Sequence, residues 1–125
     1  MKNKFPTKVY HIIFDGFDCD RKILNDERFI LKLLLEITDL IKMKILAGPN
    51  IVRDYNKKTP GISAFEIVNF SHISVHTFPK TREIYVDIFS CRPFDYKKVK
   101  KYLYKKLKLK QNQVETLEIK YPWEK

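Results

Sequence analysis

Glycine and cysteine are both scarce in this 125-residue chain, which has three glycines and two cysteines. No glycine-rich phosphate loop and no Gly-x-Ser-x-Gly nucleophile elbow is present, so common nucleotide-transfer and serine-hydrolase designs are excluded. Cys19 and Cys91 are too few and too distant in sequence for a disulfide framework. We therefore expect two reduced thiols, one of which could be reactive.

Long hydrophobic runs are also absent. No apolar run approaches the roughly 18 residues of a membrane-spanning helix. Residues 1–8 are polar and basic, with no apolar stretch behind them of the kind found in secretory signals. We expect a soluble, cytoplasmic protein without a membrane partner. The length suits a single domain, 1–125, and 44% hydrophobic residues suffice for a core.

Acidic residues are too few to balance the basic ones, and the formal net charge is +10. Most of this excess comes from one segment, because residues 97–110 contain eight lysines and no acid. Lysine without arginine, and without an exposed aromatic platform, suits a solvated helix face better than base recognition. We therefore expect no nucleic-acid partner.

Hydrophobic periodicity predicts six strands and two helices. The strands are expected at 8–17, 43–47, 62–70, 72–78, 83–91 and around 114–119. One helix is expected from Asp26 to Lys42 with Asn25 as its cap, and a second is expected after Asp95, which can cap it. Residues 52–60 are expected to form a charged loop. This order predicts an α+β fold, a two-layer sandwich of a mainly antiparallel sheet with both helices on one face. The uncovered face could pack against a second copy, so we expect a dimer formed through the sheet side.

The stretch NFSHISVHTFPK, residues 69–80, concentrates the candidate chemistry. His72 and His76 would lie about 13 Å apart in an extended strand, using roughly 3.3 Å per residue, so they cannot share one metal ion. No Cys-x-x-Cys or His-Glu-x-x-His motif occurs, and we expect no metal site. A Cys91–His76 pair could act in catalysis. A hydrogen-bonded core histidine and a buried thiol would explain the same residues.

The run SHISVHTFP at 71–79, followed by YVDIFSC at 85–91, resembles the prokaryotic S-adenosylmethionine decarboxylase proenzymes. The hallmarks of that family are ESHISIHTWPE and then DVFTCG. Further similar positions are His11 in the first strand, Asp18 to Asp20 after it, Leu24 to Asp26 at the helix start, and Gly61 to Ser63 before the central strands. The resemblance therefore extends over most of the chain.

The resemblance implies an enzyme that makes its own cofactor. Ser71 matches the serine whose hydroxyl attacks the preceding carbonyl, so that an ester forms and then a pyruvoyl group. The chain would be cut between Phe70 and Ser71 into a β chain, 1–70, and an α chain, 71–125. The pyruvoyl carbonyl would form a Schiff base with the substrate and act as the electron sink during loss of CO₂. In the family this reaction serves spermidine and other polyamine biosynthesis.

The resemblance also implies the roles of the other site residues. His76 matches the base that removes the serine α-proton, Ser63 the hydroxyl that assists the acyl shift, and Cys91 the acid that reprotonates the substrate carbanion. Ser71 and His76 would lie roughly 16 Å apart on opposite faces of one straight strand. The family solves this with a homodimer, in which one protomer supplies Ser71 and Cys91 and its partner supplies Ser63 and His76.

Three positions are expected to contact substrate, and two of them depart from the family in chemical character. Phe78 replaces a tryptophan and keeps an aromatic face for adenine. Phe70 replaces the glutamate before the cleaved bond. Lys80 replaces a glutamate that binds the ribose hydroxyls, and lysine has only donors where a carboxylate would accept. Two alternatives stay open, namely the same machinery acting on ornithine or arginine, and an unprocessed, non-catalytic homologue.

Overall fold

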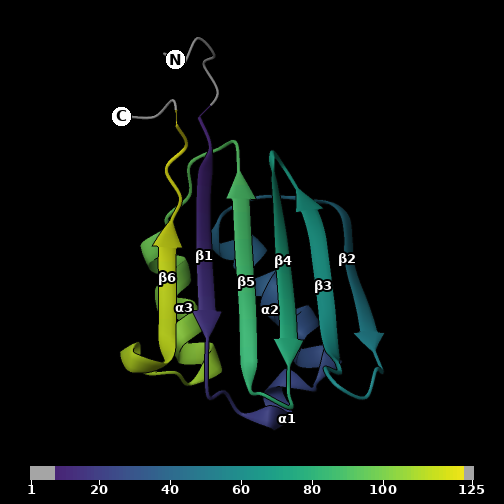
Figure 1. The fold of residues 1–125 in the computed structure, drawn as a ribbon. Helices are drawn as coiled ribbons and strands as arrows, with labels where there is room; N and C mark the ends of the chain where they lie inside the picture. Colours follow the sequence, from purple (N-terminus) through teal and green to yellow (C-terminus); the bar gives the residue numbers. More distant parts are fainter. Residues whose placement is uncertain (1–7, 123–125) are drawn as a thin grey trace.

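One antiparallel sheet forms the front layer of the molecule and the helices form the back layer (Figure 1). The computed structural model describes residues 8–122. The strands are β1 Tyr10–Gly16, β2 Ile45–Asp54, β3 Gly61–Val68, β4 Ser71–Phe78, β5 Glu83–Ser90 and β6 Val114–Glu118. The helices are α1 Arg21–Leu24, α2 Glu27–Leu40 and α3 Tyr96–Leu107, and a 3-10 turn spans Gln111–Gln113. The sheet order is β2-β3-β4-β5-β1-β6 with every neighbouring pair antiparallel, which confirms the predicted α+β sandwich.

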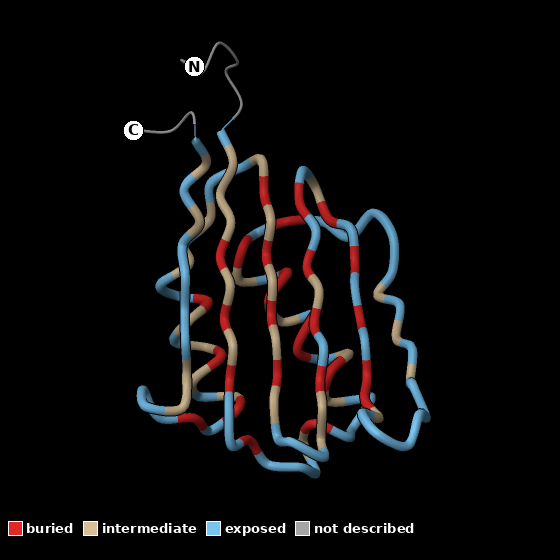
Figure 2. Tube along the Cα trace, viewed as in Figure 1, coloured by how far each residue is buried: buried red, intermediate tan, exposed pale blue. Residues whose placement is uncertain are grey.

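The core lies between the sheet and the helices. Along β5 the side chains of Ile84, Val86 and Ile88 are buried, and the residues between them are partly exposed. Figure 2 shows this alternation along the central strands. Strands with period-two alternation have one apolar face, and here that face packs against α2 and α3. Replacing a fully buried leucine such as Leu34 by alanine would cost about 2–5 kcal/mol.

The caps of the helices follow local side-chain chemistry. Asp95 caps α3 as predicted and accepts from the backbone N–H of Lys98 at 3.1 Å. At α2 the prediction of Asn25 was wrong, because Asp26 accepts from the N–H groups of the first turn at 3.0 and 3.2 Å. The short helix α1, which sequence reasoning did not predict, ends at Leu24 with Asn25 as its C-cap, and it displaces the start of α2 by one residue. Each aspartate cap stabilises its helix by about 1 kcal/mol.

The edge strand β2 is longer than predicted. The predicted strand 43–47 was expected to end at Gly48 and Pro49, but β2 continues through them to Asp54. Its register with β3 shifts between Ile45 and Asn50, so the two chain breakers form a bulge. A proline is tolerated there because the missing N–H lies on an edge strand. The predicted loop 52–60 is therefore shorter and begins after Asp54.

The lysine-rich segment forms the solvent side of α3, as predicted. Val99, Leu103 and Leu107 are buried against the sheet, while six of the eight lysines in residues 97–110 are exposed. None of the helices within residues 8–122 is long and apolar enough to span a membrane.

Glu66 places a carboxyl group in the core, on the helix-facing side of β3, with no exposed surface. The hydroxyl of Thr38 contacts one Glu66 oxygen and donates to the carbonyl of Leu34 at 2.8 Å. A hydrogen bond donated by Thr38 to that Glu66 oxygen stabilises the charged carboxylate. The other Glu66 oxygen has no hydrogen-bond partner among residues 8–122. Burial raises the pKa of Glu66, against the opposing effect of the Thr38 contact.

We expect Glu66→Gln to stabilise the protein at about pH 7.5 and to change little at about pH 4. A carboxyl group whose pKa is raised by folding stabilises the fold fully below its ordinary value of 4.5. That contribution is lost as the pH rises through the folded-state pKa, and one pH unit between the two values corresponds to about 1.4 kcal/mol. Urea unfolding across this range measures the effect. A variant whose stability falls with rising pH as steeply as that of the wild type would contradict it.

Candidate active site

The turn between β3 and β4 contains the predicted cleavage bond. Asn69 and Phe70 form this turn, and Phe70 has a left-handed φ of +58°. This conformation is rare for a bulky side chain and costs about 1–3 kcal/mol. The Phe70 carbonyl oxygen accepts a hydrogen bond from the Cys91 backbone N–H at 2.8 Å. The Phe70–Ser71 peptide therefore combines backbone strain with a polarised carbonyl.

Ser71 is the first residue of β4, and its side chain lies on the helix-facing side, 6% exposed. Its hydroxyl is 2.6 Å from the Ser90 hydroxyl and 3.0 Å from the Met43 sulfur. Ser90 is the direct register partner of Ser71 on β5 and is completely buried. The hydroxyl of Ser71 therefore has close neighbours within its own chain.

Cys91 follows β5 immediately and lies beside the same turn. A shallow pocket of about 390 Å³ is lined by Leu46, Ile67, Val68, Phe70, Ser71, His72, Phe89 and Cys91. The structure thus places Ser71 and Cys91 together. Both cysteines are free thiols, as predicted. Burial, and then the charge of Asp18, raises the pKa of Cys19 to about 11, so that thiol stays protonated and unreactive at neutral pH.

Ser63 and His76 form a second pair on the face of the sheet that the helices do not cover, which we call the open face. They are register partners on β3 and β4, with Ser63 Oγ 2.8 Å from His76 Nδ1, and both are exposed. Ser71 lies five residues from His76, roughly 16 Å along the strand, with its side chain on the other side of the sheet. One chain therefore places Ser71 beside Cys91 and Ser63 beside His76, but it does not bring these two pairs together.

The three predicted substrate positions lie at both ends of β4. Phe70 is 60% exposed at the Ser71 end, with the Arg92 guanidinium 4.7 Å from its ring centroid. Phe78 lies at the His76 end and meets Tyr85 edge to face, with ring centroids 6.0 Å apart. The Lys80 ammonium, in the turn beyond Phe78, donates to a backbone carbonyl at 3.1 Å. Like the two pairs, these positions are divided between the ends of the strand.

Sequence reasoning assigned no role to His11 and His72, which make further contacts on the open face. His11 Nε2 lies 2.9 and 3.0 Å from the two oxygens of Asp87, and His11 Nδ1 lies 3.0 Å from the Tyr121 hydroxyl. His72 stacks on Phe89 with ring centroids 5.1 Å apart and planes 9° apart. Alternation along β5 predicts the open-face position of Asp87 and Phe89, but the partners across the sheet depend on register.

Sequence reasoning also did not identify Ser90 as a site residue, although the alternation of buried and partly exposed residues along β5 could have indicated it. This alternation places Ser90 on the buried side of the sheet with Ile84, Val86 and Ile88. A buried hydroxyl requires a hydrogen-bond partner, and only the strand pairing shows that this partner is Ser71.

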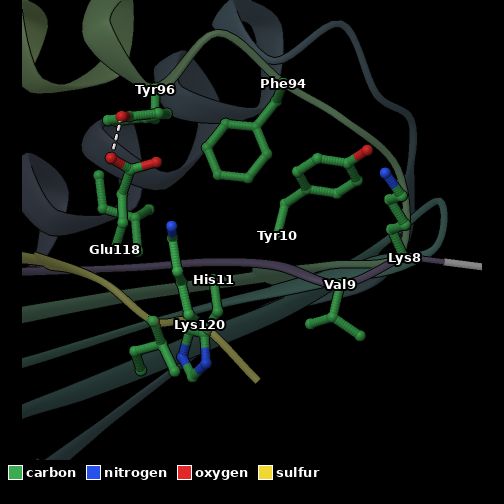
Figure 3. A pocket seen from close by; sticks show the side chains of 10 residues that line it. Lys8, Val9, Tyr10, His11, Phe94, Tyr96, Glu118 and Lys120 are labelled. Carbon is green, nitrogen blue, oxygen red and sulfur yellow. Dashed lines mark hydrogen bonds between the residues drawn. The ribbon is translucent and has the colours of Figure 1, made fainter. Parts of the chain in front are cut away.

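A separate pocket of about 400 Å³ lies near the start of β1 and the end of β6 (Figure 3). Three aromatic rings, Tyr10, Phe94 and Tyr96, gather there, and the Tyr96 hydroxyl donates to Glu118. None of the predicted site residues lines it. Within residues 8–122, no group of three His, Cys, Asp or Glu side chains is arranged to hold a metal ion.

Comparisons with known proteins agree with this architecture. The sequence model of the S-adenosylmethionine decarboxylase family matches residues 10–119. An S-adenosylmethionine decarboxylase proenzyme of Clostridium botulinum strain Langeland is 32% identical over 109 residues, covering 82% of this chain and 90% of that protein. A proenzyme of the same name from Saccharolobus islandicus strain L.S.2.15 is 31% identical over 90 residues, covering 71% of this chain and 70% of that protein. The crystal structure of the adenosylmethionine decarboxylase from Aquifex aeolicus VF5 shares the fold, with a TM-score of 0.71, 19% identity and coverage of 90% of this chain and 89% of that one. The chain belongs to the S-adenosylmethionine decarboxylase family.

Proposed function

We propose that this chain is the proenzyme of a pyruvoyl-dependent S-adenosylmethionine decarboxylase that cleaves itself between Phe70 and Ser71. The observation that supports this most directly is the geometry of that peptide bond. Phe70 is held in a left-handed conformation, and its carbonyl oxygen accepts from the N–H of Cys91. A donor fixed on a carbonyl oxygen stabilises the negative charge that develops there during nucleophilic attack. The cytoplasm remains the expected location.

The surroundings of Ser71 fit a pyruvoyl group at this position. The side chain is enclosed by the Met43 thioether and the Ser90 hydroxyl, and the pocket that it shares with Cys91 opens toward solvent. The group has a methyl where serine has its hydroxymethyl, so it needs no additional room. When formed, it supplies an electron sink for the carbanion left by loss of CO₂.

A two-fold dimer through the open faces would complete the site. This face carries exposed apolar side chains, which usually mark an interaction surface. They are Leu46, Val52, Phe65, Ile67 and Phe70. The Ser63–His76 pair is exposed on the same face. Packing these faces together would bring the Ser63–His76 pair of the partner to the Phe70–Ser71 turn, and two-fold symmetry would create two such sites.

In this arrangement His76 acts as the base that converts the ester to the pyruvoyl precursor. It removes the α-proton of Ser71, the electrons of that C–H bond form a Cα–Cβ double bond, and the Cβ–Oγ bond breaks to release the carboxylate of Phe70. Addition of water and loss of ammonia then leave the keto group. The Ser63 hydroxyl, 2.8 Å from His76 Nδ1, holds the imidazole ring in a fixed orientation.

Lys80 supports a second candidate, the same machinery acting on ornithine or arginine. Its ammonium donates to the carbonyl of Lys57 at 3.1 Å and cannot accept from ribose hydroxyls. The aromatic faces of Phe70 and Phe78 favour the adenosyl substrate. Release of CO₂ from S-adenosylmethionine, ornithine and arginine, each labelled in its carboxyl group, distinguishes these substrates.

Mass spectrometry of the purified protein tests the proposal directly. We expect fragments of residues 1–70 and 71–125, with the second beginning in a keto group in place of the Ser71 amine. The processed protein should release CO₂ from S-adenosylmethionine. A chain that stays whole and releases no CO₂ would contradict the proposal and favour a non-catalytic homologue.

We expect Cys91→Ala to slow decarboxylation by about 100-fold while self-cleavage continues, because general acids contribute about 10²–10⁴-fold. The contact to the Phe70 carbonyl comes from the backbone N–H of residue 91, which alanine retains. Gel analysis of cleavage and CO₂ release by the processed variant separate the two effects. Cys19→Ala is the matched control, since that buried thiol is expected to affect neither. Full turnover by the Cys91 variant would exclude the thiol as the proton donor.

A further inference from the structure

We infer that Ser90 is a positioning residue for self-cleavage, and that it orients the Ser71 hydroxyl for attack on the carbonyl carbon of Phe70. The inference rests on the proposed function. It adds Ser90, on the helix-facing side of the sheet, to the Ser63–His76 pair that is expected from the partner protomer.

The hydrogen bonds of Ser90 determine the direction of the Ser71 proton. The Ser90 hydroxyl lies 2.6 Å from the Arg92 carbonyl oxygen and 2.9 Å from the Arg92 N–H. It must donate to the first and accept from the second, because a carbonyl only accepts and an N–H only donates. One lone pair of Ser90 remains, and the Ser71 hydroxyl lies 2.6 Å away. Ser71 is therefore the donor in this contact, and its own lone pairs point away from Ser90.

The other neighbours of Ser71 cannot fix the hydroxyl as well. The Met43 sulfur, at 3.0 Å, is a weak acceptor. Ser63 of the same chain is exposed on the open face, so it does not contact the buried Ser71 side chain. Among residues 8–122, Ser90 is thus the strongest acceptor found for the Ser71 hydroxyl.

Two consecutive residues at the end of β5 hold the two reacting groups. The Ser90 side chain holds the attacking hydroxyl, and the Cys91 N–H holds the oxygen of the carbonyl under attack. Fixing both groups reduces the entropy lost on reaching the transition state. Because a neutral hydroxyl does not retain a second proton, Ser90 positions the nucleophile and does not act as a base.

The step that Ser90 assists is an isomerisation and needs no co-reactant. A lone pair of Ser71 Oγ forms a bond to the Phe70 carbonyl carbon, and the C–N bond to the Ser71 nitrogen breaks. The bonding pair stays on that nitrogen. The hydroxyl loses one proton and the nitrogen gains one, so the amide becomes an ester and a free amine without any change in composition.

The test compares Ser90→Thr with Ser90→Val in the full chain, because threonine and valine have nearly the same shape and only threonine has a hydroxyl. We expect Ser90→Thr to cleave within about threefold of the wild-type rate and Ser90→Val to cleave at least about tenfold more slowly. Hydroxylamine cuts esters, so it reports whether the acyl shift has occurred. At a time when the wild type is fully processed, it should leave most of Ser90→Val whole, whereas His76→Ala, which is blocked after the shift, should be cut.

Thr77→Val is the matched structural control. Thr77 is another buried hydroxyl on the same side of β4, and it donates to the Leu24 carbonyl at 2.8 Å. We expect this variant to lose stability without slower cleavage. If Ser90→Val does not fold, Ser90→Ala replaces it and the comparison with Ser90→Thr stands. Cleavage of the hydroxyl-free variant at the wild-type rate, or equally slow cleavage of Ser90→Thr, would overturn the inference. A wild-type chain that never cleaves would instead overturn the proposed function.

Discussion

Ser71→Ala should leave the chain as one uncut polypeptide that releases no CO₂. The hydroxyl of Ser71 is the attacking atom and the source of the keto group, so no neighbouring residue can substitute for it. The fold should persist, because alanine is smaller and loses about 1 kcal/mol with the Ser90 hydrogen bond. A denaturing gel, the intact mass and CO₂ release measure the result.

Ser74→Ala is the control for this experiment. Ser74 lies in the same strand but is half-buried on the open face, opposite Asp87. It should cleave like the wild type. Normal turnover by the Ser71 variant would exclude pyruvoyl chemistry for this chain, whatever its family.

Coexpression of Ser71→Ala with His76→Ala should restore cleavage that neither variant shows alone. In the proposed dimer each site takes Ser71 from one protomer and His76 from the other. A mixed dimer then has one intact site and one doubly mutated site. With random pairing half of the dimers are mixed, so about a quarter of the wild-type sites should cleave and turn over. Gel densitometry and CO₂ release, each normalised to total protein, measure this fraction.

A second mixture provides the contrast. Ser71 and Cys91 are expected from the same protomer, so coexpressed Ser71→Ala and Cys91→Ala should contain no fully intact site. Cleavage should occur in that mixture while CO₂ release stays slow. If coexpressed Ser71→Ala and His76→Ala cleave no more than either variant alone, the shared site is contradicted. The base would then come from the same chain as the nucleophile.

Most of the architecture could be predicted because its signals are local. Strand β5 alternates buried and partly exposed residues as expected, and Asp95 caps α3 where predicted. The predictions that were wrong concern segments whose local sequence is compatible with two different structures. Gly48 and Pro49 are compatible with a strand end or with a bulge, and only pairing with β3 selects the bulge. Asn25 and Asp26 are both good cap residues, and the formation of α1 determines which one caps α2.

In the candidate site, too, some features could be predicted from the sequence and others depended on strand pairing. Its residue types followed from the resemblance, and the opposite orientation of Ser71 and His76 followed from their spacing. The contacts of Ser90 with Ser71 and of Ser63 with His76 required the register of the β3–β4–β5 hairpins. No property of single residues specifies that register before the strands pair. The conformation of Phe70 likewise depends on closing a two-residue turn between β3 and β4.

By itself the sequence determined the spacing of apolar residues along each helix and strand, because this spacing repeats within a few residues of the chain. That spacing determines which side chains of the sheet face the helices and which face outward. The sequence also determined the serine, histidine and cysteine available for chemistry. Tertiary structure alone decided which of these residues meet, because partners in a sheet are distant in sequence and are selected by turn length and core packing. For this reason the hydroxyl nearest to Ser71 is that of Ser90, from another strand.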